Sequence, residues 1–162
     1  MEDFPSILTV RHTMDWKLVA LHKHWVTADA VKQFVSSPVP SRTEDTLPPD
    51  MLAPAQVFST FARLSVWYAL LYVVVEGYRE LKLQDPEVDA LLEREECVDT
   101  LRRFRNAVFH YQDDPLTEKL LGFLETPESE VWVQQVNRAF ERFFRAHLPI
   151  DEYLNRMRAR GA

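Results

Sequence analysis

The stretch from Arg102 to Tyr111 carries cationic and titratable side chains within a pattern that otherwise predicts a core helix. Three of its residues, Arg105, Asn106 and His110, have types that suit the cleavage of RNA without a metal. An imidazole can take the 2′-hydroxyl proton near neutral pH, and a guanidinium can hold the phosphate while negative charge develops on it. We therefore expect His110 to act as general base and Arg105 as phosphate clamp, with Asn106 as the positioning group.

The spacing of Arg105 and His110 limits how the two side chains can cooperate. On an ideal helix, positions this far apart are separated by roughly 140° around the axis and by ~7.5 Å along it. Either the arginine bends back along its flexible stem, or a second copy of the helix supplies the partner across a two-fold axis. The second arrangement is a composite site in a homodimer. Arg102 and Tyr111 are expected to contact the substrate beside it.

A purely structural interpretation of the same residues stays open. Arginine-rich helix ends usually face solvent, and a histidine in the last turn of a helix often only stabilises the helix dipole. Glu93, Glu95 and Glu96 lie upstream of the arginines. Ion pairs within the helix, each worth about a few tenths of a kcal/mol, are enough to account for Arg103. They do not account for the set formed by Arg105, Asn106 and His110.

These residues also carry a resemblance to a known family. The motif Arg105-Asn106-x-x-x-His110, on a late helix of a small all-α chain, resembles the signature of the HEPN superfamily (higher eukaryotes and prokaryotes nucleotide-binding domains). A long apolar helix before the motif and an amphipathic helix after it extend the resemblance over most of the chain, from about Val10 to Leu148. The resemblance implies a helical bundle that dimerises through the motif helices. In many members it also implies a metal-independent endoribonuclease that leaves a cyclic phosphate.

Carried over residue by residue, the resemblance makes Arg105 and His110 the catalytic pair and Asn106 the polar orienting residue. It implies RNA as substrate and a toxin–antitoxin or phage-defence setting, with a cognate antitoxin or regulatory protein as a further partner. One position departs from the family pattern. Toxin members paired with a nucleotidyltransferase antitoxin often carry a tyrosine two places after the histidine, where this chain has Gln112, and Tyr111 follows the histidine directly. Family members without nuclease activity exist, so a non-catalytic module that binds RNA, a nucleotide or another protein stays open.

The composition limits the kind of protein. The chain has 162 residues, 46% hydrophobic residues and 3 glycines, which suits a single domain over 1–162. A formal charge of −6 and a pI near 5.4 exclude a histone-like, broadly basic nucleic-acid binder, so any RNA site must be local. The single cysteine, Cys97, predicts a buried or half-buried thiol in a reducing cytoplasm. The N-terminus lacks a basic region leading into an apolar run, so we expect no secretory signal.

The spacing of apolar residues predicts an all-α, up-and-down bundle of about four to six helices with a long central apolar helix. We expect helices at about 10–35, 54–81 and 85–111, and then at 116–125, 126–148 and within 149–162, which ends in a basic tail. Asp85 as N-cap and Pro86 in the first turn open the third of these helices, which we expect to bend near Glu93. Five prolines between Ser36 and Pro54 predict a long loop at 37–53, either a plain surface connection or a lid over the site. The most apolar run, Leu64 to Val75, is shorter than the ~20 residues that span a bilayer and predicts a core helix.

Two further positions have competing interpretations. Glu76 closes the apolar run of the central helix and either pairs with an arginine of the motif helix or faces water. His12, His22 and His24 invite a metal hypothesis, but His22 and His24 diverge by roughly 160° on a helix. No cysteine or carboxylate is spaced to complete a tetrahedral site. We therefore expect neither a metal nor a cofactor.

Overall fold

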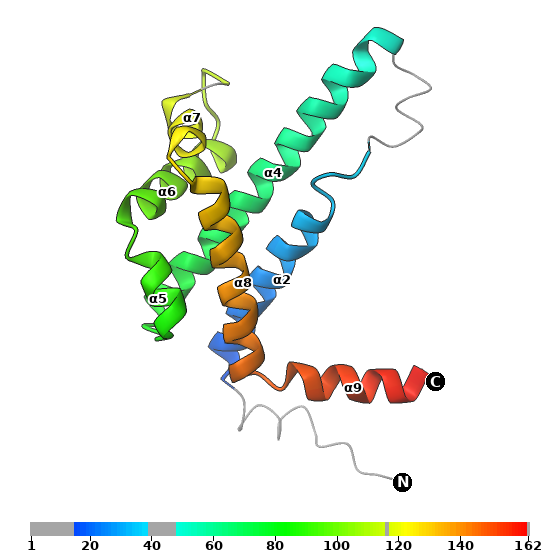
Figure 1. Cartoon of the computed structure of the whole chain (residues 1–162), viewed down its shortest axis with the longest axis vertical. Coiled ribbons are helices and arrows are strands. Elements are labelled where there is room, and N and C mark those ends of the chain that lie inside the picture. The colour runs from blue at the N-terminus through cyan, green and yellow to red at the C-terminus, as the bar shows by residue number, and fades with distance from the viewer. Residues whose placement is uncertain (1–14, 39–47, 116, 162) are drawn as a thin grey trace.

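The structure of the protein is a computed structural model, which describes residues 15–38, 48–115 and 117–161. Within these ranges the chain forms helices and no strand (Figure 1). The seven helices are α2 (Trp16–Gln33), α4 (Pro49–Glu80), α5 (Pro86–Leu92), α6 (Glu95–Phe109), α7 (Glu118–Glu125), α8 (Ser129–His147) and α9 (Ile150–Gly161). The predicted all-α bundle with one long apolar helix is confirmed, with more helices than the expected four to six.

Helices α2 and α4 run antiparallel and pack against each other along their length (Figure 1). The Asp15 side chain caps α2 by accepting hydrogen bonds from two backbone N–H groups of its first turn, at 3.0 and 3.3 Å. The helices approach so closely that a Cβ added to Gly77 of α4 would lie 2.5 Å from Leu21 Cδ1. Glycine at this position permits the close contact, directly beside Glu76.

An aromatic cluster links α4 with α6, α7 and α8. The ring of Phe104 in α6 lies 6.0 Å from that of Tyr68 in α4 and 5.6 Å from that of Phe123 in α7. Phe123 in turn lies 6.4 Å from Trp132 in α8, in an edge-on arrangement that favours aromatic pairs. Phe104, Phe123 and Trp132 are fully buried. The face of α6 that meets α4 is therefore set by the core.

The start of α4 corrects the predicted loop. The helix begins at Pro49, so the prediction of a loop at 49–53 is wrong. The first four N–H groups of a helix have no partner inside it, so proline at the first position loses no hydrogen bond, and Asp50 in the first turn suits the helix dipole. Pro54 lies inside the helix and removes one hydrogen bond near its N-terminus. Residues 39–47, the rest of the predicted loop or lid, lie outside the described ranges.

The segment before the motif forms two helices instead of one. Asp85 caps α5 by accepting from the N–H groups of Glu87 and Val88, and Pro86 takes the first helical position, as predicted. The helix ends at Leu92, and α6 starts anew at Glu95. The bend expected near Glu93 is thus a complete break, which lets α6 turn across α4.

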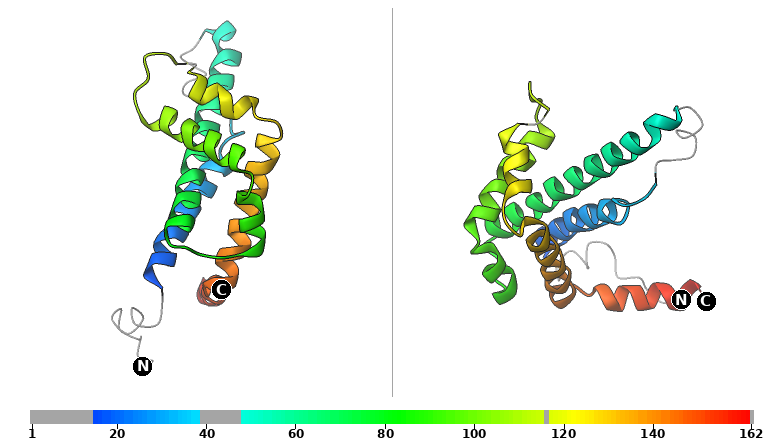
Figure 2. Two further views of the ribbon diagram at one scale, coloured as in Figure 1. Left: turned by 90° about the vertical axis from the view of Figure 1, so that its left-hand side faces the viewer. Right: turned by 45° about the horizontal axis from the view of Figure 1, so that its top comes forward.

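The C-terminal helix α9 extends away from the other described helices and contacts the end of α8 near its own start (Figure 2). The predicted C-terminal helix is confirmed, running from Ile150 to Gly161. Of the expected basic tail, Arg158 is exposed. The side chains of Arg156 and Arg160 lie outside what the structure describes.

Among the described helices, α4 is the one that is long and apolar enough, by length and composition, to cross a membrane. Core helices of soluble proteins meet the same two criteria. The residues of α4 from Trp67 to Tyr78 are mostly buried against neighbouring helices. The prediction of a core helix at 64–75 agrees with this burial.

Candidate functional site

Helix α6 lies across α4 and turns an apolar face toward it. Val98, Leu101 and Phe104 are buried, and their three-residue spacing places them on one side of the helix. The arginines that follow them lie at the edges of this face. A ligand in solvent can therefore reach the edge of α6 without opening the core.

The guanidinium of Arg105 is held by two side chains of α4. Arg105 Nη2 donates to Glu76 Oε1 at 2.8 Å, and Arg105 Cζ lies 5.1 Å from the centroid of the Tyr72 ring. The Arg105 side chain is 22% exposed, and that of Glu76 is 50% exposed. Arg105 Nε is buried and has no hydrogen-bond partner among the described residues. Of the two interpretations of Glu76, the ion pair with an arginine of the motif helix is the one observed.

The neighbouring arginines pair within α6. Arg102 Nη2 and Arg103 Nη2 each lie 2.8 Å from an oxygen of Asp99. The hydrogen bond from Arg102, helped by the charges of both arginines, lowers the pKa of Asp99. Intrahelical pairs were expected, but Asp99 makes them instead of the glutamates upstream, because it lies three and four residues away. Exposed pairs of this kind contribute little to stability and exchange readily with a ligand.

His110 lies just beyond the end of α6. The helix ends at Phe109, and His110 adopts an extended conformation, with φ −119° and ψ 143°. Its backbone N–H donates to the carbonyl of Asn106 at 3.1 Å, and the Asn106 residue itself is half-buried. The predicted position of His110 in the last helical turn is therefore wrong. The angle and rise expected for an ideal helix do not apply to it.

The chain leaves the helix at this point because side-chain hydrogen bonds favour an extended exit. The Gln112 amide donates to the carbonyls of His110 and Tyr111, at 3.1 and 2.9 Å. Tyr111 is 90% exposed and lies beyond the end of α6, so the prediction that the helix continues to residue 111 is wrong. The His110 imidazole is exposed and makes no hydrogen bond to any residue that the structure describes. It is free to meet a ligand or a second chain.

Of the α4 residues at this site, Tyr72 and Arg79 were not predicted from the sequence. Tyr72, Glu76 and Arg79 recur at i, i+4 and i+7, a spacing that places them on one side of α4, where Arg105 of α6 packs. Burial raises the pKa of Tyr72; the charge of Glu76 acts in the same direction, and the charges of Arg102, Arg105 and Arg79 oppose it. Three arginines and one glutamate thus act on the Tyr72 hydroxyl. Polar and charged residues at helical spacing within an apolar run were the signal in the sequence that could have revealed this face of α4.

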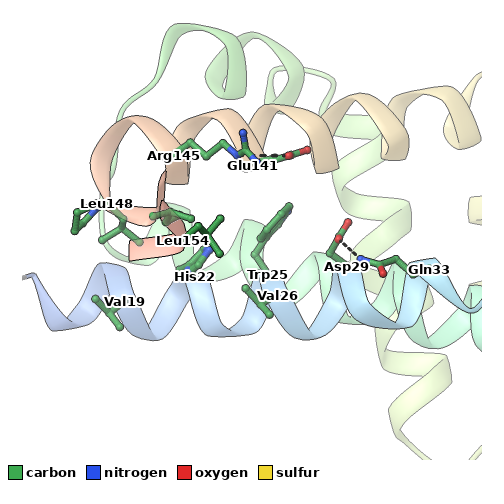
Figure 3. A pocket seen from close by; sticks show the side chains of 12 residues that line it. Val19, His22, Trp25, Val26, Asp29, Gln33, Glu141, Arg145, Leu148 and Leu154 are labelled. Carbon is green, nitrogen blue, oxygen red and sulfur yellow. Dashed lines mark hydrogen bonds and ion pairs between the residues drawn. The ribbon is translucent and has the colours of Figure 1, made fainter. Parts of the chain in front are cut away.

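A pocket of about 700 Å³ lies away from the motif, between α2, α8 and the start of α9 (Figure 3). Its wall is largely apolar, with charged residues at the rim. Figure 3 shows Trp25 and Asp29 on α2 facing Glu141 and Arg145 on α8. No residue of the motif lines this pocket, so its size does not connect it with the predicted chemistry.

Two titratable side chains of α2 line the same pocket. Burial lowers the pKa of His22, whose ring packs against aromatic neighbours. Burial also acts to raise the pKa of Asp29, but hydrogen bonds from Gln33 and Asn137, together with the charge of Lys32, outweigh it and lower that pKa. The neutral imidazole and the carboxylate are therefore the favoured forms near neutral pH.

In the described part of the chain, no group of three or more His, Cys, Asp or Glu side chains lies close enough to hold a metal ion. His12 lies outside the described residues. Cys97 is buried, as predicted, and burial raises the pKa of its thiol. A buried thiol of raised pKa is a poor nucleophile, so Cys97 belongs to the core.

Comparisons with family models, with curated proteins and with solved structures found no match to this chain. The interpretation of the site therefore depends on the residues themselves: a positioned arginine, a half-buried asparagine and an exposed histidine on one short segment.

Proposed function

We propose that the chain is a metal-independent endoribonuclease whose active site is shared by two copies. His110 takes the proton of the RNA 2′-hydroxyl, and the 2′-oxygen attacks phosphorus. The bond from phosphorus to the 5′-oxygen breaks, the 5′-oxygen leaves with the bonding electrons and takes a proton from water, and a 2′,3′-cyclic phosphate remains on the other fragment. Arg105 stabilises the charge on the phosphate and Asn106 positions the reacting groups, while Arg102 and Tyr111 contact the flanking RNA.

The observation that carries this proposal is the environment of Arg105. Its guanidinium is held against Tyr72 and Glu76 of another helix, while its buried Nε still lacks an acceptor among the described residues. A buried N–H group without an acceptor costs free energy, and a phosphate oxygen would supply the missing acceptor. A guanidinium held in place before the substrate arrives is what electrostatic stabilisation of a transition state requires.

The position of His110 supports a composite site. In one chain its side chain is exposed beyond the end of α6, and among the described residues it makes no hydrogen bond to Arg105 at the α4–α6 contact. Two α6 helices paired about a two-fold axis would place the histidine of one copy beside the arginine of the other. Phe109 and Tyr111, both exposed beside His110, are apolar surface that such pairing would cover. A cytoplasmic toxin–antitoxin or defence setting belongs to the same proposal.

Cleavage of a defined RNA in EDTA tests the activity. We expect the parent protein to leave a cyclic phosphate, and His110→Ala and Arg105→Ala to lose most of the rate, because general acid–base catalysis alone contributes about 10²- to 10⁴-fold. If His110→Ala cleaves as fast as the parent, His110 is not the base and the proposed mechanism is wrong.

Mixing the two inactive variants tests whether the site is shared. A mixed dimer of His110→Ala and Arg105→Ala retains one site with both groups intact, so activity should return on mixing. Each variant mixed with itself is the control and should stay inactive. If the parent is active and mixing restores nothing, the two groups act within one chain.

A protein-binding module is the second candidate function, and a different surface favours it. Phe34, which follows the last residue of α2, and Met51, Val57 and Phe58 of α4 are exposed, and the Phe34 carbonyl accepts a hydrogen bond from Arg63 of α4. Apolar patches on a soluble protein commonly mark contacts with another protein. Under this function Phe58→Glu would abolish partner binding, whereas Arg105→Ala would leave it intact; the ribonuclease proposal makes the opposite assignment.

A further inference from the structure

Glu76 occupies the edge of Arg105 that a phosphate would use. The carboxylate is held through a single oxygen, 2.8 Å from Arg105 Nη2. Anions that bind arginine in the fork geometry accept from two N–H groups at once. Arg105 Nε, on the same edge of the guanidinium as one of its terminal nitrogens, is buried without a partner among the described residues. Glu76 therefore satisfies only part of what the guanidinium offers.

Little else holds Glu76 in this place. Its side chain is 50% exposed, and Arg105 is the one partner that the described residues give it. Glu76 also lines an open groove of about 410 Å³ between α2 and α4, whose lining includes the charged side chains of Lys17 and Glu80. A carboxylate that leaves Arg105 can turn into this open groove, which Lys17 also lines. Since exposed ion pairs contribute little, the exchange is easy.

Arg105 would keep its position after such an exchange. The Tyr72 ring that supports the guanidinium belongs to a residue that is only 6% exposed, on the most buried part of α4. The preceding residue, Phe104, is fully buried and anchors this turn of α6 in the aromatic cluster. Two core residues therefore fix the arginine, and Glu76 is the movable member of the site.

We infer that Glu76 is a displaceable occupant of the anion site on Arg105, and that a phosphodiester of bound RNA takes its place and fills Nε as well. This inference depends on the proposed function for the identity of the ligand. Glu76 then acts as a built-in competitor that weakens RNA binding. An anion that offers two acceptor oxygens, as a phosphodiester does, displaces it more effectively than an anion that reaches only one N–H group.

The direction in which Glu76→Gln changes the Kd for RNA distinguishes a displaceable carboxylate from one that only positions Arg105. Glu76→Gln keeps the size of the side chain but removes the competing charge, so a 2′-O-methyl RNA, which cannot be cleaved, should bind with a Kd about two- to fivefold lower. If Glu76 instead positions Arg105 for the substrate, the same substitution raises the Kd. Fluorescence anisotropy at low salt measures either change.

Glu80→Gln is the matched control. Glu80 is exposed one turn further along α4, so Glu80→Gln removes the same charge but leaves the ion pair between Glu76 and Arg105 in place. The inference expects a clearly smaller effect from Glu80→Gln, and none from Glu76→Gln when Arg105→Met is also present. A decrease in Kd that is equal for Glu76→Gln and Glu80→Gln would show a general charge effect and overturn it.

Cleavage of unmodified RNA by the parent keeps this result distinct from the proposed function. Tighter binding by Glu76→Gln without cleavage by the parent supports the displaceable carboxylate and contradicts the ribonuclease. Cleavage by the parent with unchanged or weaker binding by Glu76→Gln supports the ribonuclease and overturns the inference. No binding of the modified RNA by any variant overturns the inference.

Discussion

Substitution of two adjacent residues of α6 should change the stability by very different amounts, because Phe104 faces the core and Arg105 lies at its edge. Phe104 is fully buried, with the rings of Tyr68 and Phe123 no more than 6.0 Å away. Phe104→Ala removes these contacts and leaves a cavity, at a cost of about 3–5 kcal/mol. Domains of this size are stable by about 5–15 kcal/mol, so this variant should be severely destabilised.

Arg105→Met should change the free energy of unfolding by less than about 1 kcal/mol, since opposing contributions nearly cancel. The half-exposed ion pair with Glu76 contributes about 0.2–1 kcal/mol after solvent screening. The contact with the Tyr72 ring adds about 0.5–1 kcal/mol. Against this, the unpaired buried Nε costs about 1–3 kcal/mol, which methionine removes while keeping an apolar stem. Stability therefore gives no reason for an arginine at this position.

Urea unfolding followed by tryptophan fluorescence and helical circular dichroism measures both variants. The slope of free energy against urea should match the parent for Arg105→Met, because the same surface is exposed on unfolding. A loss above about 2 kcal/mol in Arg105→Met would exceed the value expected for exposed pairs. Such a loss would make Arg105 a structural residue and remove the main support for its function.

Three further predictions concern α2 and α8. The folded state lowers the pKa of His22, so the unfolded state binds an extra proton as pH falls below the unfolded pKa of about 6.5. The free energy of unfolding should therefore fall between pH 7 and 5, and it should fall less in His22→Gln than in the control His24→Gln. Urea unfolding over this pH range measures the difference. The folded state lowers the pKa of Asp29, so its carboxylate stabilises the fold above the unfolded pKa of about 3.9, and this stabilisation is lost as pH falls through the folded pKa. Asp29→Asn should be less stable than the parent at pH 7, and its free energy of unfolding should fall less steeply in acid. Trp132→Phe removes the hydrogen bond from Nε1 to the carbonyl of Leu91, 2.8 Å long, and leaves that carbonyl unpaired, so thermal unfolding should show a loss of about 1–3 kcal/mol with the helical spectrum retained. A variant as stable as the parent would show that water replaces the indole.

Helix starts could be predicted from the sequence where the residues that determine them act within a single turn. Asp85 and Pro86 predicted the start of α5 because a side-chain cap and a fixed φ work within one turn. The prolines at 48 and 49 misled, because the same residues suit an extended loop and the first turn of a helix. Whether the helix starts there depends on how many later residues of α4 find a core to pack on, which is a tertiary property.

The site was harder to predict than the fold, because its geometry depends on neighbours distant in the sequence. Glu76 was a foreseeable partner for an arginine, but the choice of Arg105 follows from the way α6 crosses α4. The position of His110 depends on Gln112, whose amide stabilises the extended exit from the helix by hydrogen-bonding backbone carbonyls. Helical spacing assumes that the helix continues, and here it ends one residue before the histidine.

The contrast among the three arginines of α6 is the strongest argument for a site at this place. Arg102 and Arg103 share Asp99 of their own helix, a pairing that any isolated helix of this sequence could make. Arg105 alone of the three is held by another helix, and this contact leaves one of its donors buried and unpaired. A structural ion pair would be expected to satisfy both groups it joins. The fold positions Arg105 but leaves its Nε donor unpaired, so a ligand can supply the missing acceptor, and the charge of the guanidinium makes an anion the preferred ligand.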